Sequence, residues 1–155
     1  MFYNNNVKLI NDKSKKALYG GIRMYKIVKK ETLAPNIYLM DIEAPRVAKS
    51  CNPGQFVIVK MDEKGERIPL TICDYDRSMG TVTIVFQALG TSTKRMAEYE
   101  VGESYRDFSG PLGCKSELVD ESDEELKKKH ILFVAGGVGT APVYPQVKMM
   151  KERGI

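Results

Sequence analysis

Six short segments rich in β-branched and aromatic residues constrain the fold of this chain more than any other feature. Turn-forming residues separate them, as at residues 34–36 and 52–54. Residues whose side chains would point to the two faces of a strand alternate most clearly at 81–87, where Val82, Ile84 and Phe86 share one apolar face. Short strands at this spacing predict an antiparallel barrel or sandwich, interrupted by one short helix at residues 92–100. The strands are expected at residues 24–31, 36–43, 54–61, 67–73, 80–87 and 103–109.

The segments on either side of this pattern have a different character. Residues 1–23 are polar and basic without sustained periodicity, which predicts a loosely ordered extension before a domain at residues 24–117. An acidic run followed by three lysines at 127–129 has no apolar stripe, which favours a solvated linker at residues 118–130 over a charged binding surface. Residues 131–135 are fully apolar, as is typical of a buried parallel strand. A glycine loop and a helix opened by Pro142 follow, so residues 131–155 form half of a βαβ unit.

Charge and cysteine content exclude several classes of function. The net charge is +4, but residues 1–30 carry eight Lys and Arg against one Asp, so the remainder is mildly acidic. Tyr and Phe are not interleaved with Lys and Arg along the strands, which disfavours an oligonucleotide-binding barrel and nucleic-acid partners. No apolar run is long enough to span a membrane. Cys51, Cys73 and Cys114 form no metal-binding pattern, and without an export signal they indicate reduced thiols in the cytoplasm.

Three short motifs carry chemistry, and each also has a purely structural explanation. The glycine loop at 136–141 follows an apolar segment and opens a helix, so its amides could bind a diphosphate, although any tight strand-to-helix turn needs glycines. Arg67 could clamp a phosphate beside Pro69, which breaks a β-ladder, or it could be a solvated side chain on an edge strand. Residues 90–93 combine a glycine and three hydroxyls before a helix, where Thr91 or Ser92 could simply be an N-cap.

The order of these motifs resembles that of the ferredoxin–NADP reductase superfamily. The likeness runs from about Met24 to the last residue and rests on a succession of motifs. These are R-x-P-L-T, a strand, G-x-S-T before a helix, G-P-L-G at 110–113, and an apolar segment with G-G-x-G-x-A-P. Within the superfamily, the likeness is greatest to the flavin-carrying subunits of NADH-dependent reduced ferredoxin:NADP oxidoreductase, sulfide dehydrogenase and dihydroorotate dehydrogenase. The resemblance implies an antiparallel Greek-key FAD-binding barrel, followed by a Rossmann-like NAD(P)H-binding domain that this chain only begins.

The resemblance also implies roles for particular residues. Arg67 would hold the FAD diphosphate, and Thr71, the candidate catalytic residue, would hydrogen-bond the flavin edge near N5. Pro69 and Leu70 would shape the backbone against the ring, while Val85 and Gln87 would face the ribityl and adenosine side. The amides and hydroxyls expected to bind the diphosphate belong to Gly90, Thr91, Ser92 and Thr93. The pyridine-nucleotide loop would comprise Gly136, Gly137, Gly139, Thr140, Ala141 and Pro142.

Three departures from the family pattern limit what the resemblance implies. Leu70 stands where many members have an aromatic residue, none of the cysteines lies where related subunits bind a [2Fe-2S] cluster, and most of the NAD(P)H domain is missing. We therefore expect a truncated FAD-binding electron-transfer subunit that works between NAD(P)H and a larger iron–sulfur flavoprotein partner or ferredoxin. Alone, the chain should be incompetent in NAD(P)H turnover. The alternative is a non-catalytic flavin-binding or scaffolding barrel.

Overall fold

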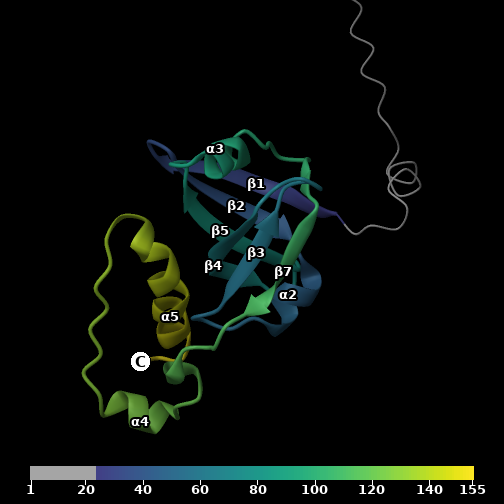
Figure 1. Ribbon diagram of the computed structural model, residues 1–155. Helices are drawn as coiled ribbons and strands as arrows, with labels where there is room; N and C mark the ends of the chain where they lie inside the picture. The colour runs from purple at the N-terminus through teal and green to yellow at the C-terminus, as the bar shows by residue number, and fades with distance from the viewer. Residues whose placement is uncertain (1–23) are drawn as a thin grey trace, which may run out of the picture.

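Seven antiparallel strands dominate the computed structural model, which describes residues 24–155 (Figure 1). The strands are neighbours in the order β6-β1-β2-β5-β4-β3-β7. Because β6 and β7 follow each other in the chain and lie at the two edges of this sheet, the sheet curls into a nearly closed barrel. The predicted antiparallel barrel is confirmed, whereas the predicted extension at 1–23 lies outside the described residues. The strands are β1 (Tyr25–Ala34), β2 (Ile37–Glu43), β3 (Phe56–Lys60), β4 (Arg67–Asp76), β5 (Thr81–Gln87), β6 (Ser104–Tyr105) and β7 (Asp107–Leu112).

The core lies inside the barrel and follows the alternation of the strands. In β5, Val82, Ile84 and Phe86 are buried, while the residues between them are half-buried on the outer face. Strands β2 and β4 contribute Met40, Ile42 and Ile72 to the same interior. Burial of apolar side chains on one face of every strand provides the main driving force for this arrangement. The outer faces of these strands therefore remain available to contact other segments.

Three helices cover or flank the barrel. Helix α2 (Pro45–Ser50) was not predicted, although Pro45 at its first position is a typical helix-opening residue, and its Val47 and Ala48 join the core. The helix expected at 92–100 is α3 (Thr91–Ala97), which lies at one end of the barrel and buries Met96 (Figure 1). Helix α5 (Thr140–Glu152) lies beside β4 and follows a short 3₁₀ turn, Gly137–Gly139.

The segment between the barrel and α5 differs from prediction. Residues 131–135 do not form the expected buried strand, and Leu132 and Val134 are 85% and 79% exposed. A parallel strand needs a neighbour to pair with, and every strand in residues 24–155 is already part of the barrel. Residues 118–130 contain most of a 3₁₀ turn, Glu117–Val119, and the short helix α4 (Asp123–Lys127), whose Leu126 is buried. Over the described range, no helix has the length and apolarity needed to cross a bilayer.

Candidate functional site

Strand β4 changes neighbour halfway along its length, and this change opens the barrel wall. Its first half pairs with β3, with Arg67 opposite Lys60 and Thr71 opposite Phe56. Pairing with β5 begins only at Ile72. On the side away from β3, residues 67–71 therefore have no strand neighbour within the described residues, and Pro69 lies in this half. A proline is tolerated there because the missing N–H removes no bond from a second ladder.

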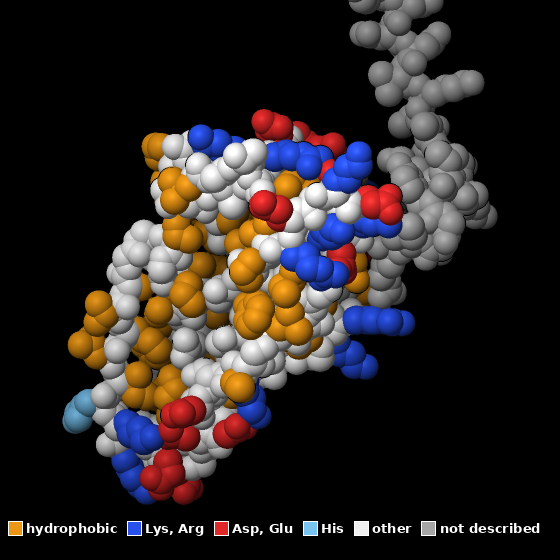
Figure 2. All heavy atoms as spheres, in the orientation of Figure 1, with side chains coloured by type: hydrophobic (Ala, Val, Ile, Leu, Met, Phe, Trp, Pro, Cys, Tyr) orange, Lys and Arg blue, Asp and Glu red, His pale blue; other side chains and the backbone are white. Residues whose placement is uncertain are grey.

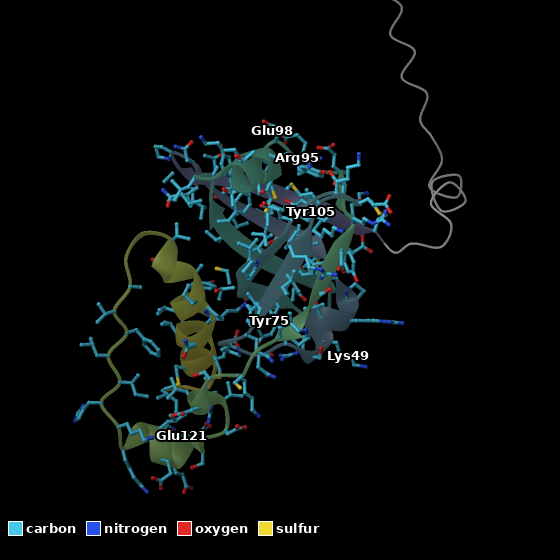
Figure 3. All side chains as sticks on the ribbon, in the orientation of Figure 1. Lys49, Tyr75, Arg95, Glu98, Tyr105 and Glu121 are labelled. Carbon is cyan, nitrogen blue, oxygen red and sulfur yellow. The ribbon has the colours of Figure 1, made fainter. Side chains whose placement is uncertain are left out.

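Helix α3 lies at the end of this opening and is tied to the turn before β4. Ser92 Oγ donates a hydrogen bond to the Glu66 carboxylate, and Arg95 forms an ion pair with Asp62. Figure 3 shows Arg95 on α3 at the end of the barrel farthest from α4. These contacts bring two of the predicted motifs, Arg67 with its neighbours and residues 90–93, to adjacent positions. Glu66 and Asp62 were not anticipated from sequence, because single carboxylates in a turn carry no distinguishing pattern.

The first residues of α3 are capped by a side chain that the sequence analysis did not single out as the cap. Thr93 Oγ1 accepts hydrogen bonds from the backbone N–H groups of Leu89 and Gly90, both at 3.1 Å. The structure shows no side-chain cap from Thr91 or Ser92. A Cβ atom added to Gly90 would meet nothing within 4 Å, so the space in front of this turn is open. An incoming group can approach the backbone here without displacing protein atoms.

Arg67 lies at the rim of the opening and is 57% exposed. Its Nη2 is 3.1 Å from Asp107 Oδ2 on β7, which no sequence pattern indicated. A guanidinium group has five N–H donors, so a contact with one carboxylate leaves donors available for an anionic ligand. Exposed ion pairs of this kind contribute little to stability, and Arg67 can exchange its partner at small cost in free energy.

A cavity of about 680 Å³ lies between the outer face of the barrel and the glycine loop. Val85 from β5 faces Gly137, Thr140 and Ala141 across it, so the structure brings these four predicted residues together. Figure 2 shows hydrophobic side chains along the face where α5 meets the barrel. Most of the lining was not predicted from sequence, and it comes from four strands, the 3₁₀ turn and α5. These residues are Lys29, Leu33, Ala34, Ile37, Leu39, Asp41, Cys73, Asp74, Thr83, Val138 and Tyr144.

Polar groups of the cavity are concentrated on its barrel wall. Thr83 Oγ1 donates to Asp41 Oδ1 at 2.6 Å, and Lys148 from α5 donates to both oxygens of Asp74. Burial raises the pKa of the Cys73 thiol to about 11, so this thiol is protonated at neutral pH. The site therefore has an apolar floor with hydroxyl and carboxylate groups at fixed positions and no activated thiol. Such a surface suits a largely apolar planar ligand with a few polar edges.

The remaining predicted residues lie outside the cavity lining. Gln87 ends β5 opposite Ile37, and Pro142 lies in the first turn of α5. A Cβ atom added to Gly136 or Gly139 would meet nothing within 4 Å, so the loop's backbone is open to approach. Gly137 has a φ of +54°, a left-handed conformation that favours glycine. The predicted residues thus form two neighbouring groups, one at the β4 opening and one at the glycine loop, with Val85 on the strand that borders both.

Comparisons with known proteins found similar curated proteins and similar solved structures. No family model matches the chain. It is 66% identical over 132 residues to an uncharacterised Clostridium beijerinckii protein from the adh 3′ region, covering 85% of this chain and 45% of the relative. It is 38% identical over 135 residues to a Thermotoga maritima homologue of the dihydroorotate dehydrogenase B electron transfer subunit. This match covers 87% of this chain and 45% of the relative. The chain therefore spans about half the length of these curated relatives.

Among the solved structures, a similar one shares both fold and sequence with the chain. This structure, of an NADH-dependent reduced ferredoxin–NADP oxidoreductase studied for flavin-based electron bifurcation, superposes with a TM-score of 0.74 at 36% identity. The match covers 87% of this chain and 46% of the other. It includes both the barrel and part of the segment after it, because the barrel alone is shorter than the matched portion.

Proposed function

Because the chain belongs to the ferredoxin–NADP reductase superfamily, we propose that it binds FAD as the flavin-carrying part of an electron-transfer subunit. This subunit would move electrons between NAD(P)H and a larger iron–sulfur flavoprotein partner or ferredoxin, in the cytoplasm. The observation that carries the proposal is that β4 connects the opening beside Arg67, at residues 67–71, to the cavity between the outer barrel face and the glycine loop, which Cys73 and Asp74 of the same strand line. Its volume of about 680 Å³ lies within the range of cofactor pockets, and its walls are largely apolar.

The residues at the two groups of the site fit this cofactor. Arg67 and the open backbone before α3 offer cationic and amide donors for a diphosphate. The half of β4 at residues 67–71, with no strand on one side, offers free backbone groups to a planar polar edge, and Thr71 would hydrogen-bond the flavin near N5. Pro69 and Leu70 would shape that backbone, while Val85 and Gln87 would face the ribityl and adenosine side. The glycine loop would take the pyridine nucleotide.

Bound FAD would supply the redox chemistry, and the protein would supply position and electrostatics. The residues of this chain would bind the diphosphate and orient the ring against β4, and α5 would limit the access of water from its side. Thr71 would hold a hydroxyl near the flavin nitrogen that gains a proton on reduction. No group in the cavity needs to act as a nucleophile, consistent with the raised pKa of Cys73.

Titration with FAD tests the proposal directly. We expect the purified full chain to bind FAD with a shift of the flavin absorption band, and to bind riboflavin far more weakly because riboflavin lacks the diphosphate. The alternative, a non-catalytic scaffolding barrel, would leave the spectrum of added FAD unchanged at every protein concentration. Identical affinities for FAD and riboflavin would contradict the assignment of the diphosphate site.

Substitution of Thr71 tests the proposed contact with the flavin edge. Thr71→Ala should leave folding nearly intact but shift the flavin midpoint potential by roughly 10–30 mV, the equivalent of one hydrogen bond for a two-electron couple. Thr32→Ala, an exposed substitution on β1, is the matched control. Equal midpoint potentials in the Thr71→Ala and Thr32→Ala proteins would argue that Thr71 does not contact the ring.

A further inference from the structure

One ion pair joins the barrel directly to α5. Lys148 Nζ donates to Asp74 Oδ1 at 2.7 Å and to Oδ2 at 2.9 Å, across 74 residues of sequence. Within residues 24–155 it is the single salt bridge between a barrel strand and α5. The two side chains are only 36% and 26% exposed, so solvent screens this pair less than a fully exposed one. Contact with both carboxylate oxygens also restricts the position of the lysine.

A β-bulge aims Asp74 at α5. The register between β4 and β5 shifts between Ile72 and Asp74, so β4 carries an extra residue there. Strict alternation from buried Ile72 would turn Asp74 toward the core, where a carboxylate is costly. With the bulge, Cys73 and Asp74 both line the cavity, and Tyr75 packs against the core instead. Re-aiming one side chain is a recurrent role of bulges beside functional sites.

The lysine lies on the face of α5 that meets the barrel. Ala141 and Tyr144 line the cavity in the first turns of the helix, and Lys148 follows one turn later on the same side. Figure 3 shows Tyr75, the neighbour of Asp74, at the end of the barrel nearest α5. The other long-range side-chain hydrogen bonds at this end of the chain involve the segment before α5. Ser116 Oγ donates to Gln146 Oε1 of α5, and Arg153, just after the helix, donates to Asp123 and to backbone oxygens of that segment.

We propose that Asp74 is a positioning residue whose ion pair with Lys148 holds α5, and the glycine loop at its N-terminus, over the cofactor cavity. This inference rests on the proposed function, because it assigns the cavity to FAD. The hydrogen bond with Asp74 is the largest influence that raises the pKa of Lys148 above its ordinary value, so Lys148 keeps its positive charge throughout the neutral range. The bulge and the ion pair together set how closely the loop approaches the barrel wall.

Hydrogen exchange of the cofactor-free chain tests the anchoring itself. In Asp74→Asn and in Lys148→Met, amides of residues 140–152 should exchange about two- to fivefold faster, with the barrel strands unchanged. The double variant should be no faster than the more affected single variant, because both remove the same interaction. Glu43→Gln and Lys151→Met, which remove charges that form no ion pair among residues 24–155, should leave exchange unchanged. Unaltered exchange in both single variants would overturn the proposal.

FAD binding by the same proteins tests the link to the cavity. We expect the dissociation constant for FAD to rise about two- to fivefold in Lys148→Met and to return most of the way in Lys148→Arg, which keeps the charge. The loss of FAD affinity in Lys148→Met should shrink with added salt, whereas a loss caused by a packing defect would persist. Faster exchange with unchanged FAD affinity would refute the positioning role. If the wild-type chain binds no FAD, the proposed function fails, and the exchange experiment still decides whether the ion pair anchors α5.

Discussion

Replacing Ile84 by alanine should lower the free energy of unfolding by about 2–5 kcal/mol, measured by urea denaturation. Ile84 is fully buried in β5, where it pairs with Met40 of β2 and Ile72 of β4, both also fully buried. Removing its side chain leaves a cavity at the centre of the barrel that neighbouring strands cannot close without shifting. The loss combines the transfer of apolar atoms to water with the energy of that cavity.

The next residue along β5 provides the control. Val85 faces outward and lines the cofactor cavity, so Val85→Ala should cost about 1 kcal/mol or less in stability. It should weaken FAD binding, whereas Ile84→Ala should act mainly through folding. Equal losses of stability in the two variants would mean that the inward and outward faces of β5 are not as the structure shows.

Replacing Arg67 by alanine should weaken FAD binding by about 1.5–3 kcal/mol, which is roughly a tenfold to 150-fold rise in the dissociation constant. The guanidinium lies at the rim of the β4 opening, held near Asp107 at 3.1 Å and free to exchange that partner for a diphosphate. Isothermal titration with FAD measures the change. Riboflavin binding should be little affected, because riboflavin carries no phosphate.

Two further variants make this result specific to Arg67. Arg46→Ala removes an exposed arginine from α2, away from the opening, and should leave FAD affinity unchanged. Asp107→Asn removes the carboxylate that competes for Arg67 and should not weaken binding. If Arg67→Ala and Arg46→Ala bind FAD equally well, Arg67 does not contact the diphosphate.

The barrel was predictable from sequence because its strands are determined locally. Alternation at 81–87 assigns inward and outward faces without knowledge of the neighbours, and the structure places Val82, Ile84 and Phe86 in the core. Residues 131–135 show where this reasoning fails. Their apolar composition indicates what environment they would prefer, but a parallel strand also needs partners, which no local pattern can supply.

The cavity was only partly predictable, because its wall depends on a change of register. A sequence motif located the glycine loop, and the family resemblance pointed to Val85. Alternation assigns Asp74 to the wrong face, since it cannot detect the bulge after Ile72. The partner of Asp74 lies 74 residues away on α5, and neither residue belongs to a recognisable motif. Contacts between distant segments of this kind become visible only in three dimensions.

The exposure of Leu132 and Val134 suggests a role for the charged residues just before them. An uncharged, proline-free stretch of high β-propensity is prone to self-association through intermolecular strand pairing when some of its apolar side chains are exposed, as Leu132 and Val134 are here. Lys127, Lys128 and Lys129, which the sequence analysis assigned to a solvated linker, stand immediately before His130 and this stretch. Flanking charges are the usual gatekeepers against such aggregation. Lys128 and Lys129 are paired with Glu125 and Glu121, so among residues 24–155 only Lys127 of the three carries a charge without an ion-pair partner. We therefore expect repulsion between copies at this stretch to depend mainly on Lys127 and to weaken as salt screens it.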